Sequence, residues 1–337
     1  MEDLKHVKIT TKRTSESVYK RKDLPVLAVD VAGKKIIYDT LDGYRFDHDL
    51  DINDNLALLD SVLDQCDFYF KRSYSHEYSL KLKNKNVYPL GLNYKVYNTL
   101  YKDILEYRFG SKSSIKALIS YNRHLAKVFN IEFYKDICHE NLSMLPLIRS
   151  NYSYEGSMLF LTRVWDPYEL SLPRDLIEER KLLNESRADV IRKFKKRFGK
   201  SFIGGFFDDQ YSRMHFPDLV IPKKFTSKSN YLNLMKSASI CIATTGLHGS
   251  IGWKLGEYVA CSKVVLSEPL EFVVGDGFLE GKNYISCTNN EMLNAAEKLL
   301  NQPDKMKEMM FANKAYYEKY LRPDNLILRT LQVAGVL

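Results

Sequence analysis

The stretch SASICIATTGLHGSIGWKLGEYVACSKVVLSEPL, residues 237–270, carries the clearest structural signal in the chain. Its apolar run at residues 239–243 predicts a buried strand, and residues 251–260 have the apolar spacing of a helix. The turn-rich loop TTGLHGS joins the two. In parallel α/β sheets, ligands bind at the carboxyl ends of the strands, where glycine lets the backbone approach a phosphate and helix N-termini supply free N–H groups. Residues 244–257 are therefore the candidate site of this half of the chain.

Helical geometry places Lys254 and Glu257 side by side on one face of the predicted helix, next to a loop that carries Thr245, His248 and Ser250. A carboxylate can accept hydrogen bonds from two ribose hydroxyls, and a lysine with loop amides can neutralise a diphosphate. An exposed ion pair, worth about 0.3 kcal/mol, would explain the same two charges without any ligand. The spacing alone leaves both interpretations open.

Outside this stretch, short apolar runs alternate with amphipathic helical stretches along the whole chain, which is typical of parallel α/β layers. The length of 337 residues suits two domains of about 150 residues each better than one. Periodicity is lost in residues 141–155, around Pro146, and we interpret this segment as a linker. The sequence thus predicts an N-terminal domain at residues 1–145 and a C-terminal domain at residues 146–321.

The net charge of +8 includes one clear basic cluster, residues 187–200. Its apolar positions recur at helical spacing, so its lysines and arginines form the solvated face of an amphipathic helix. Attraction to anionic lipid or to phosphate ligands is the alternative interpretation. No helix-turn-helix or RNA-recognition signature accompanies the cluster, which argues against a nucleic-acid partner.

The five cysteines are scattered and mostly set in apolar runs, without the paired spacing of a zinc site or a disulfide framework. We therefore expect them to be small core residues in a reducing cytosol. No run reaches the roughly 18 apolar residues that a spanning helix needs, and the first residues lack the apolar core of a secretory signal. The sequence predicts a cytoplasmic protein, with peripheral contact at the inner membrane face as a further option.

The order of features in residues 237–270 resembles the C-terminal donor domain of group 1 glycosyltransferases. In that family an apolar strand leads to a glycine-containing loop, a helix with a terminal glutamate, an Ala/Cys turn and a second apolar strand. The sequel GKNYI, residues 281–285, and the helices after it are also similar, so the resemblance covers about residues 157–331. It implies a GT-B fold, an α/β architecture in which two Rossmann-like domains face each other across a cleft.

The resemblance also implies roles for residues of the C-terminal domain. Glu257 matches the glutamate that holds the donor ribose, and Arg163, at the end of the domain's first strand, resembles a basic residue near the donor phosphates. A salt-bridged strand end is the alternative for Arg163, and a structural histidine is the alternative for His248. The implied donor-binding set is Glu257, Arg163, Lys254, His248, Gly246, Thr245 and Ser250.

The N-terminal half should then supply the acceptor side. An inverting transferase needs a general base at the acceptor hydroxyl, and Asp42, with Asp39 as the fallback, follows a predicted strand in a segment dense in carboxylates. Turn-capping aspartates are the alternative for both. Arg72 and Tyr74 follow another strand and could contact an acceptor. No metal cluster is visible in the sequence, and GT-B enzymes generally need none, because helix dipoles and basic side chains carry the diphosphate charge.

One position departs from the family pattern. Retaining members carry a first glutamate eight residues before the ribose glutamate, and here that position is Gly249. The expected ligands are a UDP- or GDP-linked sugar and a glycan or lipid-linked acceptor, as in the synthesis of cell-surface polysaccharide or lipopolysaccharide. A sugar-nucleotide epimerase of the same fold and a non-catalytic glycosyltransferase-like subunit are the alternatives.

The C-terminal segment, residues 322–337, is apolar over more than one face. That is too much apolar surface for a helix lying on a single domain. GT-B enzymes end with a helix that crosses back to the first domain, so we expect this segment to pack across the junction. Docking on the second domain alone is the alternative.

Overall fold

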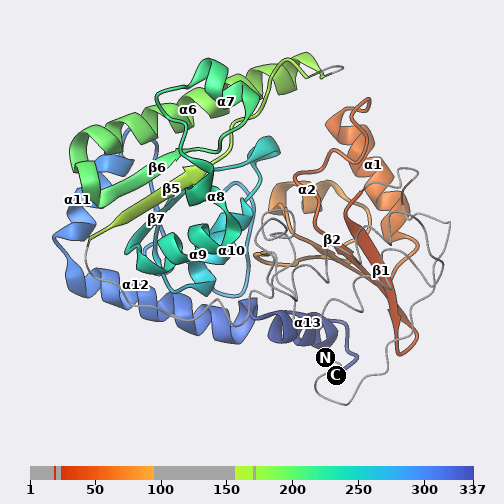
Figure 1. Cartoon of the computed structure of the whole chain (residues 1–337). Coiled ribbons are helices and arrows are strands. Elements are labelled where there is room, and N and C mark those ends of the chain that lie inside the picture. Colours follow the sequence, from red (N-terminus) through yellow and green to blue (C-terminus); the bar gives the residue numbers. More distant parts are fainter. Residues whose placement is uncertain (1–18, 20–23, 95–155, 170–171) are drawn as a thin grey trace, which may run out of the picture.

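The computed structural model of the chain forms two lobes that lie side by side (Figure 1), and each lobe is built on its own β-sheet. The residues that the structure describes are residue 19 and residues 24–94, 156–169 and 172–337. The helices predicted at residues 97–108 and 114–129 and the linker predicted at 141–155 lie outside them. Over the described chain, the predicted α/β fold with mainly parallel strands is confirmed.

The N-terminal sheet has the strand order β1-β2-β3-β4. Strands β1 and β2 form an antiparallel hairpin, and its turn residues Ala32 and Gly33 have φ values of 49° and 75°, as tight hairpin turns require. Strands β2, β3 and β4 are parallel and are joined by helices. The elements are β1 (Val26–Val31), β2 (Lys34–Asp39), α1 (Ile52–Leu63), β3 (Phe68–Lys71), α2 (His76–Lys81) and β4 (Val87–Pro89).

The C-terminal sheet has the order β6-β5-β7-β8-β9, and its described strands are all parallel. The chain passes from β5 to β6 on one side of β5 and then crosses back to β7 on its other side. Between β5 and β7 the neighbouring loops therefore diverge, which is where open α/β sheets bind their ligands. The elements are β5 (Met158–Thr162), α6 (Arg174–Phe198), β6 (Phe202–Phe206), α7 (Gln210–His215), α8 (Lys223–Thr226), α9 (Lys228–Ser237), β7 (Ile240–Ala243), α10 (Trp253–Ala260), β8 (Val264–Ser267), β9 (Ile285–Ser286), α11 (Met292–Leu300), α12 (Pro303–Tyr316) and α13 (Pro323–Val333).

Helices cover both faces of the C-terminal sheet, so its central strands are buried along their whole length. Side chains alternate along β5: Met158 and Phe160 belong to the apolar cluster of α6, α11 and α12, whereas Leu159 and Leu161 belong to the cluster of α9 and α10. Every residue of β5 and β7 is buried by this double coverage. The loops at the carboxyl ends of β5 and β7 therefore begin from strands that are held on both faces by packing.

The C-terminal helix crosses from the C-terminal lobe to the N-terminal sheet, and α13 lies below that sheet in Figure 1. The hydroxyls of Tyr38 in β2 and Thr330 in α13 are 2.7 Å apart. Arg329 donates to the carbonyl oxygen of Leu90 at 2.7 Å and pairs with Asp276 of the C-terminal lobe. The buried side chains of this contact are Ile36, Phe70, Leu90, Leu331 and Ala334.

The strand predicted at residues 239–243 and the helix predicted at residues 251–260 are found as β7 and α10, with bounds that differ by one or two residues. The sequence pattern also favours a long charged helix at about residues 174–198, and α6 has these bounds. The sequence favours Asp54 as the N-cap of α1, and this prediction was wrong, because Asp51 caps the helix and accepts from the backbone N–H of Asp54 at 2.8 Å. Helix α7 was not predicted, although its capping box at Asp209 and Ser212 is visible in the sequence.

Cys241, Cys261 and Cys287 are buried free thiols, as predicted, and Cys138 lies outside the described residues. Burial raises the pKa of the Cys287 thiol to about 12. None of the described helices combines the length and the apolar character that crossing a bilayer requires.

Candidate functional site

A cleft of about 1520 Å³ lies between the two lobes, at the carboxyl ends of β5 and β7. Its C-terminal wall includes Thr162 and Arg163, which end and follow β5, and Thr244 and Gly246, which follow β7. The N-terminal lobe closes the other side with the segment after β2 and with Arg72 after β3. This cleft therefore coincides with the switch point of the sheet.

The charges that line the cleft are unequal. Seven arginines and lysines face three carboxylates, so the lining carries 7 − 3 = +4 with neutral histidines. A concave, cationic wall attracts an anionic ligand and holds it away from water. The seven cations are Arg45, Arg72, Arg163, Arg187, Lys223, Lys224 and Lys254, and the three carboxylates are Asp42, Asp208 and Glu257.

Glu257 lies in the wall of the cleft and is 5% exposed. It sits on α10, whose neighbouring residues Leu255 and Tyr258 are buried against the sheet. The phenol of Tyr231 donates to its carboxylate at 2.8 Å, and burial, followed by the charge of Glu257, raises the pKa of Tyr231 well above its usual range. The carboxylate of Glu257 is thus buried beside the cleft and not exposed on the surface of α10.

Lys254 and Arg163 lie on opposite elements and share one aromatic neighbour. The ammonium of Lys254 is 5.0 Å from the centre of the Phe207 ring, and the guanidinium of Arg163 is 5.8 Å from the same centre. Both residues line the cleft. The structure therefore brings together the two cations that the sequence assigned to donor phosphates, each in a cation–π contact with the same ring.

The loop after β7 is built around Gly246, whose N–H donates to the carbonyl oxygen of Ser250 at 2.7 Å. A Cβ at Gly246 would lie 2.5 Å from the hydroxyl of Ser250, so this turn requires glycine. Gly246 and Ser250 both line the cleft. Thr245 points to the other side of the loop, where its N–H and hydroxyl donate to Glu268 at 2.7 and 2.8 Å. It lines a smaller pocket beside the cleft and is not among the described residues of the cleft itself, so its donor contact stays a prediction.

His248 lies in the cleft at the contact between the lobes. Its backbone is left-handed, with φ 58°, its N–H donates to Glu179, and its Nδ1 is 3.8 Å from that carboxylate. Gly43 packs so closely that a Cβ there would be 2.8 Å from the Cβ of His248. Burial lowers the pKa of His248, and the charge of Glu179 opposes that effect. His248 therefore combines a structural role with a position in the cleft.

Asp42 lines the cleft from the N-terminal lobe, with 46% of its side chain exposed. Arg72 forms an ion pair with it at 2.7 Å. The same guanidinium donates to the carbonyl oxygen of Ile251 in the C-terminal lobe and to that of Thr40 at 3.3 Å. Burial lowers the pKa of Arg72, and Asp42 opposes this shift. Arg72 thus bridges the lobes and fixes Asp42 at their border.

Asp39 and Tyr74 do not reach the cleft as predicted. Asp39 is fully buried and accepts from Lys71 at 2.8 Å, from Tyr69 at 2.7 Å and from the N–H of Leu41 at 2.7 Å. A carboxylate enclosed by these donors cannot meet an acceptor hydroxyl, so we withdraw it as a candidate base. The hydroxyl of Tyr74 donates to Ser79 at 3.1 Å, and Tyr74 is not among the described residues lining the cleft.

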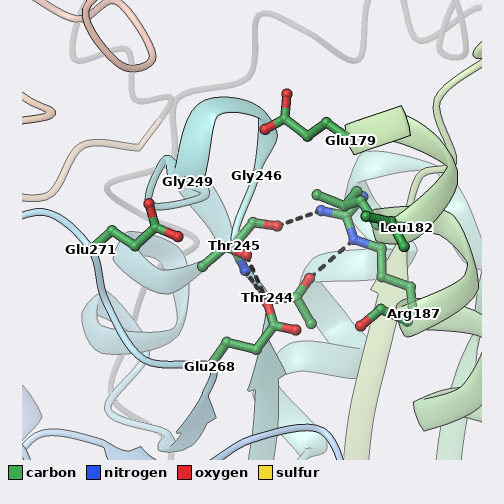
Figure 2. A pocket seen from close by; sticks show the side chains of 11 residues that line it. Glu179, Leu182, Arg187, Thr244, Thr245, Gly246, Gly249, Glu268 and Glu271 are labelled. Carbon is green, nitrogen blue, oxygen red and sulfur yellow. Dashed lines mark hydrogen bonds between the residues drawn. The ribbon is translucent and has the colours of Figure 1, made fainter. Parts of the chain in front are cut away.

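Arg187 was missed by the sequence reasoning, which assigned it to a solvated helix face. It is 6% exposed, and its guanidinium donates to the hydroxyl of Thr244 at 3.1 Å and to the carbonyl oxygens of Arg163 and Thr245, each at 2.9 Å. Burial lowers its pKa to about 10, against the opposing charge of Glu268. Arg187 therefore joins the loops after β5 and β7, and Figure 2 shows it reaching them from α6.

Other cleft residues also gave no signal in the sequence. Arg45 and His48 lie in the acidic segment after β2, and Lys223 and Lys224 lie on the short helix α8. Only the three-dimensional arrangement brings these side chains to one cavity. Within the described chain, no three His, Cys, Asp or Glu side chains are grouped so that they could hold a metal ion.

Neither a protein-family model nor the sequence of a curated protein matches the chain. Among solved structures it is similar to S. aureus TarM, with 10% identity and a TM-score of 0.44 over 88% of this chain and 50% of TarM. It is also similar to Anabaena HepE in complex with UDP, with 10% identity and a TM-score of 0.44 over 89% of this chain and 72% of HepE.

Sucrose-phosphate synthase from Thermosynechococcus elongatus is similar too, with 12% identity and a TM-score of 0.43 over 88% of this chain and 66% of that one. The chain thus spans half the length of TarM and about two thirds of the synthase. These similarities assign no activity to the chain, and the site has to be interpreted from its own residues.

Proposed function

We propose that the protein is a glycosyltransferase that moves a sugar from a nucleotide-sugar donor to a glycan or lipid-linked acceptor. The observation that carries this proposal is the position of Glu257, a carboxylate that is 5% exposed in the wall of a cleft whose lining is otherwise strongly cationic. A nucleoside diphosphate needs both features, because its phosphates are anionic whereas its ribose offers two hydroxyl donors.

The donor is held by the C-terminal lobe. Arg163 and Lys254 neutralise the diphosphate, and Glu257 accepts hydrogen bonds from the ribose hydroxyls while Tyr231 fixes its orientation. Gly246 lets the backbone of the loop after β7 approach the ligand. In this arrangement the donor lies at the switch point between β5 and β7, with the acceptor domain opposite.

The acceptor hydroxyl enters from the N-terminal lobe, where Asp42 takes its proton. The hydroxyl oxygen then forms a bond to the anomeric carbon, the bond from that carbon to the diphosphate oxygen breaks, and the nucleoside diphosphate leaves. The cations of the cleft stabilise the negative charge that develops on the leaving group. The product belongs to a cell-surface polysaccharide or lipopolysaccharide, built at the cytoplasmic side of the membrane.

Thermal denaturation with UDP-, GDP-, CMP- and dTDP-sugars tests the proposal. A ligand at 100 times its Kd stabilises the native state by about 2.7 kcal/mol, so the correct nucleotide should raise the Tm clearly. Release of the nucleoside diphosphate should then require an acceptor. Isomerisation of the donor without an acceptor would indicate an epimerase, and tight binding without turnover on any acceptor would indicate a non-catalytic subunit. No response to any nucleotide would contradict the proposal.

Glu257→Gln should weaken donor binding while the fold is kept. Losing charge-assisted hydrogen bonds costs about 1.5–3 kcal/mol, which is on the order of 10- to 100-fold in Kd. Calorimetry with the free nucleoside diphosphate measures this loss, since the ribose is present in that ligand. Tyr231→Phe is the matched control: it removes the 2.8 Å contact and leaves the carboxylate, so its loss should be smaller. Equal affinity of Glu257→Gln and wild type would exclude the ribose role.

Arg163→Gln and Lys254→Gln should each weaken binding of the sugar nucleotide much more than binding of the free nucleoside, because the lost contact is to the diphosphate. The expected loss is about tenfold or more in Kd for the sugar nucleotide. Lys196→Gln, which removes the same charge from an exposed position on α6, serves as the control and should change neither affinity. A parallel loss for nucleoside and sugar nucleotide would contradict the phosphate assignment.

A further inference from the structure

A side pocket of about 280 Å³ adjoins the cleft and shares Arg187, Thr244 and Gly246 with it. Its walls come from α6, from the loop after β7 and from the segment after β8 (Figure 2). At about 30 Å³ for each water molecule, the volume equals roughly nine waters. That is room for one monosaccharide ring with its hydroxyls, next to the region where the diphosphate is proposed to bind.

The charges of this side pocket are opposite to those of the cleft. Three glutamates line it, Glu179, Glu268 and Glu271, with Arg187 as the single cation among the described lining residues. The guanidinium of Arg187 already donates to one hydroxyl and two backbone carbonyls. Glu268 is fixed by Thr245, and Glu179 accepts from the backbone of His248. A group entering the pocket therefore leaves a cationic environment and enters an anionic one.

Glu271 differs from the other two glutamates because of its position against Gly249. A Cβ at residue 249 would overlap the carboxylate of Glu271, and the φ of Gly249, +64°, further disfavours any side chain there. The loop after β7 thus contributes only backbone at this point. The carboxylate of Glu271, from the segment after β8, completes the wall of the side pocket here. Figure 2 shows Glu271 and Glu179 on opposite sides of the loop.

We propose that Glu271 determines donor specificity by placing its carboxylate in the side pocket, so that the pocket accepts an uncharged, hydroxyl-bearing sugar and rejects a uronate. The inference rests on the proposed function, because it takes the sugar to follow a diphosphate bound in the cleft. Carboxylate oxygens accept hydrogen bonds from sugar hydroxyls. A carboxylate on the sugar would instead meet two or three like charges at short range.

Calorimetry on the full chain with UDP, UDP-glucose and UDP-glucuronate tests this inference, with GDP, GDP-mannose and GDP-mannuronate as the second set. In the set that binds, wild type should favour the neutral sugar over the uronate by about tenfold or more. Glu271→Lys should reduce or invert this preference by about tenfold, whereas the Kd of the free nucleoside diphosphate should stay within about twofold. Glu271→Gln, which keeps the shape, should give a smaller change in the same direction.

Glu178→Lys is the matched control. It makes the same change of charge on α6, at a residue that pairs with Lys181 at 3.1 Å and is not among the described residues of the pocket. It should keep the wild-type preference. The role of Glu271 would be overturned if Glu271→Lys kept the wild-type preference, or if it lost as much affinity for the free nucleoside diphosphate as for the sugar nucleotides. Either result would leave the proposed function unaffected. Absence of binding to all six ligands, together with no response to the CMP- and dTDP-sugars, would overturn the proposed function and this inference with it.

Discussion

Asp42→Asn should lower turnover by about 10²–10⁴-fold, the usual contribution of a general base, while the donor binds as in wild type. The reason is geometric: Asp42 lines the cleft from the N-terminal lobe with half of its side chain accessible, opposite the loop that is proposed to hold the donor. The measurement is kcat at saturating donor and acceptor, together with the donor Kd by calorimetry. An intact donor Kd separates a lost base from a distorted C-terminal lobe.

Asp47→Asn is the control for this experiment, because Asp47 lies in the same segment but is not among the described residues of the cleft. Its carboxylate accepts from the N–H of Asp49 at 3.0 Å, and its replacement should leave turnover near wild type. Normal turnover in Asp42→Asn would exclude Asp42 as the base. His48, the other Asp, Glu or His that the described N-terminal lobe offers to the cleft, would then be the next candidate.

The strand, loop and helix of residues 237–270 could be predicted because each local signal agreed with the others. The apolar run became β7, the glycine-containing loop came next, and α10 buried Leu255 and Tyr258 on the sheet. The helical spacing placed Glu257 next to this loop, although by spacing alone an exposed ion pair with Lys254 remained the alternative. Local periodicity is enough where a site is built from one continuous segment at a strand end.

The acceptor side could not be predicted to the same degree, because it depends on pairing between strands. Asp39 and Lys71 are register partners on the parallel strands β2 and β3, and each neutralises the other in the core. Burial lowers the pKa of Lys71, while Asp39 raises it. Nothing in the segment around Asp39 shows that a lysine 32 residues later lies next to it. From the sequence, the carboxylate of Asp39 therefore looked available as a base. In the structure it is the buried ion-pair partner of Lys71.

Arg187 is a different case, since its signal was present in the sequence. It lies at helical spacing from Asn184, Ile191 and Phe194, and these four residues of α6 are all buried. A basic residue on the apolar stripe of a helix needs buried acceptors, which the carbonyl oxygens of the loops after β5 and β7 provide. Arg187 thus belongs to the buried stripe of α6 and not to the solvated face that the other basic residues of the cluster form.

The C-terminal helix packs against the sheet of the N-terminal lobe, so a truncation after Tyr320 should destabilise the arrangement of the two lobes. The deletion removes α13 and the residues after it, including Leu331 and Ala334, each 3% exposed against the N-terminal sheet. Burial of three or four apolar side chains contributes on the order of 5–8 kcal/mol. The deletion also removes Arg329, which links Leu90 to Asp276. We expect a lower Tm, and by small-angle scattering a larger radius of gyration as the lobes separate.

A pair of point variants on the same helix tests the cause of this effect. Leu331→Ala should cost about 2–5 kcal/mol, because a buried leucine leaves a cavity against the sheet. Val333→Ala, at a position that is 42% exposed, should stay within about 0.5 kcal/mol of wild type. Urea denaturation of both variants and of the truncated chain measures the free energies of unfolding. If the truncated chain stays compact and unfolds like wild type, the packing of α13 on the first sheet does not hold the lobes together.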